Sequence, residues 1–278
     1  MFWRPGLRPS GVGKYLDKLI FGVFMAEHHK VGDLVYDPDI YDGLNKQDED
    51  LKFYLEWIKE KENQKILELC CGTGRLTIPI SIAGYNISGV DNNIAMLNMA
   101  KHKAKMNGIT IEFFEADIRY LSLKTKYDVI FIPFNSIHHL YRNEDLFLAF
   151  ECVFKHLNDE GIFLFDCYNP DIEYIVNNEG KTTLMRDYTT EKGRRIVINQ
   201  NMQYDKKTQI NQIKWQYVID GKFEPEQSLD MRMYYPQELD EYVRINGFTI
   251  FKKYGDFNSS DFMSNSVHQI FVCKKSKN

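Results

Sequence analysis

Hydrophobic positions change their period along the middle of the chain, between residues 65 and 168. Short apolar runs predict buried strands, and longer stretches with apolar residues three and four positions apart predict helices. The predicted strands are KILEL, NISGV, TIEFFEA, YDVIFI and GIFLFDCY, and the predicted helices are RLTIPISIAG (Arg75 to Gly84), NIAMLNMAKHKAKMNG and NEDLFLAFECVFKHL. Alternation of this kind is typical of a parallel sheet with helices on both faces.

The pattern changes after Pro170. The runs TTLMRDYTT, RRIVINQNMQYD, TQINQIKWQYVID and QSLDMRMYY are β-like and are separated by the turn signals EKG, DKK and DGKFEPE. They predict an antiparallel meander over residues 182–235. The last segments predict a helix at PQELDEYVRINGF and an edge hairpin made of FTIFKKYGDF and VHQIFVCKK. We therefore predict an α/β fold: a doubly wound, mostly parallel, seven-stranded Rossmann-like sheet with an inserted antiparallel β-meander as a cap.

The predicted domain organisation has three parts. Residues 1–60 form an N-terminal helical lid, residues 61–170 and 236–278 form the α/β domain, and residues 171–235 form the insertion. The segment LIFGVFMA, at residues 19–26, follows several basic residues but has no A-x-A cleavage pattern after it, which favours an amphipathic lid helix over a signal peptide. No apolar run approaches the roughly 18 residues of a membrane span.

Composition and charge narrow the function classes. The formal net charge is −4, from 35 basic and 39 acidic residues, which lacks the basic footprint of a nucleic-acid-binding protein. Five cysteines without a C-x-x-C pair favour a reduced, cytoplasmic protein and no zinc site. The pairs His28-His29 and His138-His139 are poor chelates because neighbouring side chains diverge, so we expect no metal.

Polar and glycine residues directly follow the predicted strands, where ligands bind in sheets of this type. In KILELCCGTG, Gly72 and Gly74 allow a tight turn whose backbone approaches a ligand, and Asp91 ends the next strand, where a carboxylate accepts both ribose hydroxyls. The turn is therefore expected to hold a ribonucleoside. NAD, FAD and S-adenosylmethionine all remain open, although Thr77 follows where a third glycine would stand, and Glu68 suits a cationic ligand, which favours the last.

Several ordered motifs resemble those of class I S-adenosylmethionine-dependent methyltransferases, from about Val31 onward. They are ILELCCGTGR, GVDNNIAML, FEADIRYL, YDVIFIPFNSIHHL, GIFLFDCYNP and INGFTIFKKYGDF. The chain looks closest to the small-molecule branch with an inserted β-meander, which includes sugar N-methyltransferases of antibiotic pathways. Two residues depart from the family pattern: Cys70 replaces a glycine, and Gly32 stands where an aromatic residue is often found.

The resemblance implies a set of cofactor-binding residues. Glu68, Gly72 and Gly74 would surround the methionine part, and Asp91 would hold the ribose. The complete set is Tyr36, Glu68, Cys70, Gly72, Gly74, Arg75, Asp91, Asn92, Met96, Asp117, Ile118, Pro133 and Phe134. On pattern alone, Met96 and Tyr36 are equally compatible with core packing, and Asp117 with a cap.

Acceptor-side residues are predicted partly from the resemblance, which points to His139, and partly from their places at the strand ends and in the meander. His139 is favoured as the catalytic base or acceptor-orienting group, with Tyr36 as the second catalytic residue. The predicted substrate-binding residues are His138, Asp166, Tyr168, Arg186, Tyr188, Arg232 and Tyr234. Structural roles remain open for all of them, since histidines are often structural, strand ends carry turn chemistry and paired strands pack aromatic residues.

We predict an S-adenosylmethionine-dependent methyltransferase that releases S-adenosylhomocysteine and acts, in a bacterial-type secondary pathway, on a small-molecule or short-peptide acceptor at an amine nitrogen. An oxygen acceptor is the first alternative. A nicotinamide-dependent oxidoreductase and a non-catalytic nucleoside-binding protein are alternatives of other classes. No nucleic-acid or membrane partner is expected, and the chain is expected to be a monomer or homodimer.

Overall fold

The computed structural model describes residues 31–58 and 64–277. The lid helix predicted at residues 19–26 lies outside the described residues. The boundaries of the three predicted parts stay a prediction.

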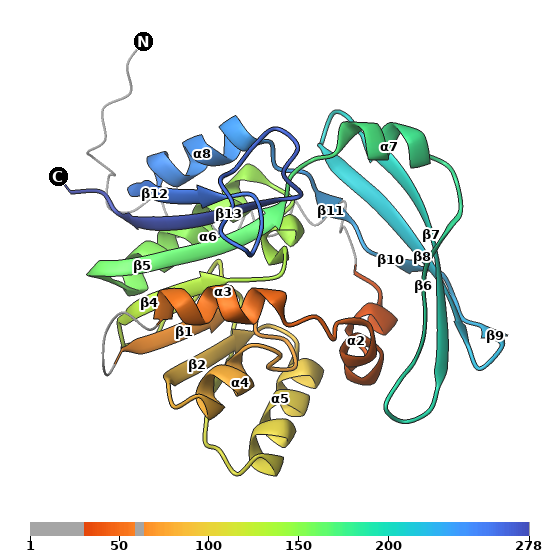
Figure 1. Ribbon diagram of the computed structural model, residues 1–278, viewed down its shortest axis with the longest axis horizontal. Coiled ribbons are helices and arrows are strands. Elements are labelled where there is room, and N and C mark those ends of the chain that lie inside the picture. The colour runs from red at the N-terminus through yellow and green to blue at the C-terminus, as the bar shows by residue number, and fades with distance from the viewer. Residues whose placement is uncertain (1–30, 59–63, 278) are drawn as a thin grey trace, which may run out of the picture. The chain divides into compact units, whose positions relative to one another are not determined.

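Seven strands form one mixed sheet in the order β12-β13-β5-β4-β1-β2-β3 (Figure 1). The strands from β3 to β5 are parallel, and β13 pairs antiparallel with both β5 and β12. Their bounds are β1 Lys65–Leu69, β2 Asn86–Asp91, β3 Phe113–Glu115, β4 Tyr127–Ile132, β5 Leu157–Tyr168, β12 Phe248–Tyr254 and β13 His268–Lys275. This confirms the predicted fold class. From β1 the chain adds β2 and then β3 on one side of that strand. It then crosses back and adds β4 on the other side of β1, so the topological switch point lies between β1 and β4.

Helices cover both faces of this sheet (Figure 1). One buried cluster includes Phe150 of α6 and Leu239 of α8. A second buried cluster includes Phe53 of α3 and Ile80 of α4, which pack on strand side chains that point to the opposite face of the sheet. The helices are α3 Glu49–Ile58, α4 Thr77–Ile82, α5 Ile94–Met106, α6 Asn143–His156 and α8 Pro236–Ile245. Alternate residues of the buried strands thus reach two cores, as a doubly wound sheet requires.

Some predicted bounds were wrong. The helix predicted from Arg75 to Gly84 begins only at Thr77, because the chain first completes a turn in which Gly74 has a φ of 79°. Pro79 then lies in the first turn of α4, where backbone N–H groups have no partner within the helix. The strand predicted at TIEFFEA is reduced to β3, and β5 begins at Leu157, which the pattern had placed in the preceding helix.

A second, antiparallel sheet contains the predicted meander. Its strands are β6 Thr183–Thr189, β7 Arg195–Asp205, β8 Ile210–Ile219, β9 Lys222–Phe223, β10 Gln227–Ser228 and β11 Met231–Arg232. The short helix α7 (Ile172–Asn178) precedes it and was missed. Its N-cap, Asp171, accepts a hydrogen bond from Tyr174 N–H at 2.8 Å, and this capping aspartate was the available signal.

The short elements η1 (Asp33–Tyr36) and α2 (Pro38–Leu44) pack on the apolar face of the second sheet. Asp37 caps α2, accepting hydrogen bonds from Asp39 N–H and Ile40 N–H. In Figure 1, α2 stands between the second sheet and the helices α4 and α5. This position brings the residues of η1 and α2 to the carboxyl ends of β1 and β2.

Candidate functional site

The glycine turn, residues 70–74, follows β1 at the switch point. Cys70, Gly72 and Gly74 all have positive φ, at 59°, 53° and 79°. At Gly74 an added Cβ would lie 2.9 Å from a methyl carbon of Ile78, so glycine is needed there for space as well as for φ. Cys70 adopts a left-handed conformation that is uncommon for a non-glycine residue, which explains why glycine would be usual at this position.

Asp91 ends β2 and faces the glycine turn. Its carboxylate accepts hydrogen bonds from Gly72 N–H and Asn93 N–H, both at 2.8 Å. Burial raises the pKa of Asp91, and these backbone donors oppose the rise. Met96 is buried and its terminal methyl lies beside Gly72, whereas Asn92 is exposed. The structure therefore brings Asp91, Gly72 and Met96 together.

Glu68 lies deeper, at the end of β1, and is buried. Thr77, in the first turn of α4, donates a hydrogen bond to its carboxylate. Burial raises the pKa of Glu68 to about 8, although the Thr77 hydrogen bond and the charge of Arg75 oppose the rise. The hydrogen bond from Thr77 to Glu68 therefore links the start of α4 to the end of β1.

Arg75 connects the turn to α3. Its guanidinium binds Asp50 through two hydrogen bonds of 2.8 and 2.5 Å and lies 4.5 Å from the ring centroid of Phe134. These contacts occupy several N–H donors of Arg75 within the protein. This predicted cofactor-binding residue therefore also has a structural role.

Two residues of α2 reach the glycine turn and were not predicted. Asp42 accepts a hydrogen bond from the buried Thr73 hydroxyl at 2.6 Å and forms an ion pair with Lys103 of α5 at 2.6 Å. The Tyr41 hydroxyl lies about as close to Gly72 as Met96 does, and its ring meets Phe134 edge-on. The Asp37-Pro38 helix start was the signal that places Tyr41 one turn along α2.

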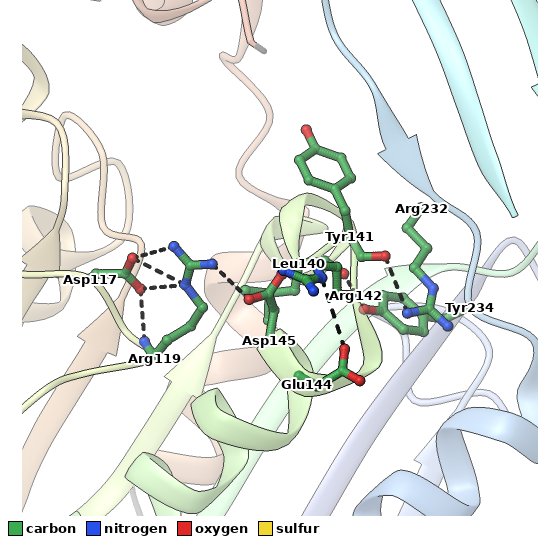
Figure 2. Close-up of polar contacts among 9 residues, drawn as sticks. All are labelled: Asp117, Arg119, Leu140, Tyr141, Arg142, Glu144, Asp145, Arg232 and Tyr234. Atoms are coloured by element: carbon green, nitrogen blue, oxygen red, sulfur yellow. Dashed lines mark hydrogen bonds and ion pairs between the residues drawn. The ribbon is translucent and has the colours of Figure 1, made fainter. Parts of the chain in front are cut away.

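Asp117 follows β3 and is held by Arg119 (Figure 2). The Arg119 guanidinium binds Asp117 at 2.6 Å and Asp145 at 2.7 Å. Burial raises the pKa of Asp117, but the Arg119 hydrogen bonds outweigh this and leave the pKa below its ordinary value. Its neighbour Ile118 is buried.

The residues after β4 are organised by Asp166, which is buried near the end of β5. Its carboxylate accepts hydrogen bonds from Phe134 N–H at 2.9 Å, Asn135 N–H at 3.0 Å and the Tyr54 hydroxyl at 2.6 Å. Pro133 precedes this turn and is buried. Asp166 was predicted to bind substrate, but these three donors occupy its oxygens.

His138 is buried and links the two sheets through its ring nitrogens. One ring nitrogen contacts the backbone carbonyl of Arg232 and the other accepts a hydrogen bond from Tyr168 N–H at 3.1 Å. Tyr168 is 42% exposed and stacks on the His138 ring with a centroid distance of 6.0 Å. Both nitrogens of His138 are therefore occupied.

Arg232 and Tyr234 also contact the loop after β4, through the carbonyls of Tyr141 and Leu140 (Figure 2). Arg232 is buried, forms an ion pair with Glu238 at 2.6 Å and lies 4.6 Å from the Tyr234 ring centroid. The buried Tyr234 hydroxyl donates to the Leu140 carbonyl. The two residues predicted to bind substrate here thus anchor the end of the insertion to the loop after β4 and to α8.

His139 and Tyr36 lie toward the second sheet. Nδ1 of His139 is 3.4 Å from the Tyr141 hydroxyl, which donates to the Asp230 carbonyl at 3.0 Å. Burial lowers the pKa of His139 to about 4, although a hydrogen bond to Asp230 opposes the shift. Burial raises the pKa of Tyr36, and electrostatic repulsion from Tyr141 and Asp91 raises it further. Tyr36 is the last residue of η1, the element that packs on the second sheet.

The remaining predicted residues are on β6. Tyr188 donates a hydrogen bond to the Ile40 carbonyl at 2.9 Å and so holds α2 on the second sheet. Arg186 is exposed on the same strand. Both residues pair with β7, opposite Ile198 and Ile196.

Two searches were confined to residues 31–58 and 64–277. No group of three or more His, Cys, Asp or Glu side chains is placed there to hold a metal ion. No helix in that part is long and apolar enough to cross a membrane.

The burial of His138 predicts a loss of stability in acid. Burial lowers its pKa from 6.5 to about 4, despite the opposing hydrogen bond to Arg232. The unfolded chain takes up this proton at a higher pH than the folded chain, so stability falls as the pH drops through that window. We expect the neutral, buried His138 to contribute about 3 kcal/mol to the free energy of unfolding. This contribution is complete above pH 6.5 and is lost by about pH 4.

Urea denaturation at several pH values measures this effect. His138→Gln should make the pH dependence shallower, while His102→Gln, at an exposed position on α5, should not. Equal pH slopes for wild type and His138→Gln would contradict the assignment.

Comparison with known proteins identifies the family of the central segment. Residues 66–161 match the family model described as "Methyltransferase domain". YqeM of Bacillus subtilis, a protein named as a methyltransferase, is 23% identical over 235 residues, which cover 81% of this chain and 90% of that protein.

Two solved structures share the fold. An S-adenosylmethionine-dependent methyltransferase from Clostridium acetobutylicum has a TM-score of 0.73 at 21% identity and covers 86% of this chain and 97% of that chain. The sugar N-methyltransferase KedS8 from a Streptoalloteichus species has a TM-score of 0.65 at 13% identity and covers 100% of this chain and 99% of that chain.

The family match and the fold set aside the nicotinamide-dependent oxidoreductase. This chain therefore carries a methyltransferase domain at residues 66–161 within the class I S-adenosylmethionine-dependent methyltransferase fold, and its cofactor is S-adenosylmethionine.

Proposed function

We propose that the chain transfers the methyl group of S-adenosylmethionine to an amine nitrogen of a small acceptor: an amino sugar, a small amine or the N-terminus of a short peptide. KedS8 is named for a reaction of this type and shares the fold, which supports the proposal by analogy.

The described residues fit the cofactor. Asp91 would accept hydrogen bonds from the ribose hydroxyls, because its oxygens lie at the carboxyl end of β2 beside the bare backbone of Gly72. The buried side chains of Met96 and Ile118 would flank the adenine. Tyr41 and Met96 bound the space above Gly72, so α2 would cover the cofactor.

The position of His139 carries the choice of nitrogen: its Nδ1 lies 3.4 Å from the Tyr141 hydroxyl, and burial there lowers its pKa. With a pKa of about 4, this histidine is neutral near neutral pH and accepts hydrogen bonds, yet it is a weak base. A hydroxyl acceptor must lose its proton to become a good nucleophile, whereas an uncharged amine attacks directly. A site in which this histidine is a weak base therefore suits an amine.

The chemical step is an in-line displacement. The amine lone pair forms the N–C bond while the C–S bond breaks, and sulfur keeps the electron pair as a neutral thioether. The product leaves as an ammonium ion or gives its proton to water. His139 then orients the amine by accepting one N–H, and the protein contributes alignment rather than proton removal.

Two measurements test the proposal. S-adenosylhomocysteine should raise the melting temperature, and NAD should not, because only a ligand that binds the folded state stabilises it. Labelled methyl transfer from S-adenosylmethionine should occur to at least one of a panel of amino sugars, small amines and short peptides. Transfer only to hydroxyl acceptors would refute the nitrogen assignment.

His139→Ala is expected to lower kcat for the amine acceptor by about 100-fold, because the amine loses its orienting partner. The affinity for S-adenosylhomocysteine should not change, as measured by calorimetry. His102→Ala, at an exposed position on α5, is the matched control and should keep wild-type activity. Unchanged kcat in His139→Ala would remove this residue from the reaction.

A further inference from the structure

Helix α2 is attached on one side to the second sheet. Arg194 donates a hydrogen bond to Asp39 at 3.0 Å. The Tyr188 hydroxyl donates to the Ile40 carbonyl at 2.9 Å, and the Ile40 side chain is buried in the apolar cluster of that sheet. At Gly43 an added Cβ would lie 2.6 Å from the Tyr188 ring, so the backbone of the helix lies directly on this side chain. Apolar burial and hydrogen bonds therefore hold α2 on the second sheet.

On its other side, α2 is joined to the glycine turn and to α5 by the carboxylate of Asp42. Oδ1 of Asp42 accepts a hydrogen bond from the Thr73 hydroxyl, and Oδ2 forms an ion pair with Lys103 Nζ, both at 2.6 Å. Thr73 is a buried residue of the glycine turn, and Lys103 lies on α5, the helix that also carries Met96. The two oxygens of Asp42 therefore connect α2 to two elements that surround Gly72.

These contacts hold α2 over the proposed position of the cofactor. The Tyr41 hydroxyl lies 3.9 Å, and the Met96 methyl 3.6 Å, from the point where a Cβ of Gly72 would stand. In Figure 1, α2 stands between the second sheet and the helices α4 and α5. Tyr41 directly precedes Asp42 in α2, so a movement that lifts Tyr41 away from the glycine turn must also break the contacts of Asp42.

The two sides of α2 differ in the kind of contact that holds them. Apolar burial contributes on the side of the second sheet. The side chains of Asp42 and Lys103 are 27% and 31% exposed, and an ion pair at such a position is weakened by water and by salt. Helix α2 should therefore separate more readily from the glycine turn than from the second sheet.

We propose that Asp42 is a positioning residue whose contacts with Thr73 and Lys103 form a latch that sets the rate at which S-adenosylhomocysteine leaves. The inference rests on the cofactor position in the proposed function and adds how that site opens. Both contacts are made to groups of the protein, so they must break before S-adenosylmethionine enters and again before the product leaves. The latch thus slows entry and release alike and has little effect on the equilibrium affinity.

Surface plasmon resonance of S-adenosylhomocysteine on the immobilised full chain tests the latch. Asp42→Ala should raise the association and the dissociation rate constants about tenfold each, and should leave Kd within about twofold of wild type. Asp42→Asn keeps an acceptor for the Thr73 hydroxyl but loses the charge that pairs with Lys103, so both rate constants should rise only about threefold. Lys103→Met removes the same ion pair from the other side and should match Asp42→Asn.

Asp33→Ala is the matched control, because it removes the same charge from an exposed position on η1, and its rate constants should equal those of wild type. The melting temperature without ligand shows whether each variant is folded, and Asp42→Asn and Lys103→Met carry the test if Asp42→Ala does not fold. Equal rate constants in wild type and the latch variants would overturn the proposal. Faster dissociation with unchanged association would also overturn it, since that result marks a side chain that binds the cofactor directly. Absence of S-adenosylhomocysteine binding to wild type would instead refute the cofactor position, and the latch with it.

Discussion

Asp91→Ala is expected to weaken the binding of S-adenosylhomocysteine by about 100-fold. The aspartate carboxylate would make two charge-assisted hydrogen bonds to the ribose hydroxyls, and such bonds are worth about 1.5 to 3 kcal/mol each. The same carboxylate also accepts Gly72 N–H at 2.8 Å, so its loss frees the glycine turn that approaches the cofactor. Isothermal titration calorimetry measures the effect directly.

The control for Asp91→Ala is Asp159→Ala, which removes the same charge from a side chain that is 91% exposed. Its affinity for S-adenosylhomocysteine should equal that of wild type. If Asp91→Ala also binds S-adenosylhomocysteine as tightly as wild type, the cofactor does not lie at this strand end.

Asp166→Ala is expected to lower the free energy of unfolding by about 4 kcal/mol, because the change strands three donors. The donors are Phe134 N–H, Asn135 N–H and the Tyr54 hydroxyl, and Tyr54 is completely buried. Urea denaturation gives the magnitude. The variant should also lose acceptor turnover, because the turn that carries Asn135 and His139 depends on this carboxylate.

Asp166→Asn distinguishes hydrogen bonding from charge. The amide keeps one acceptor oxygen but brings two N–H donors, so it should recover only part of the stability. Asp159→Ala, on the same strand, should stay within about 0.5 kcal/mol of wild type. A loss below about 1 kcal/mol for Asp166→Ala would show that the three bonds are replaced by solvent.

The sequence alone predicted the elements that depend on local rules. The periodicity distinguished the helices from the strands in the order that builds the sheet. At the start of α5, Asn93 accepts hydrogen bonds from Ala95 N–H and Met96 N–H, as the local rule for helix caps leads one to expect of an asparagine. The glycine turn and Asp91 were also found from sequence. Each of these predictions rests on residues close together in the chain or on the rule that parallel strands end at one edge.

The sequence placed residues near the site but did not determine their partners. Asp166 and His138 follow strands as acceptor residues would, and both are committed to buried hydrogen bonds. Their partners, Tyr54 and Arg232, come from 112 and 94 residues away. No local pattern reports a hydrogen bond between segments so distant, because it forms only when the fold brings them together.

The tertiary structure likewise brought Tyr41 and Asp42 of α2 to the glycine turn. The sequence by itself thus determined the fold class and the order of its strands and helices, because period, turn and cap rules are local. Only the tertiary structure decided which polar groups are occupied by the protein's own hydrogen bonds, because burial and pairing depend on contacts between distant segments.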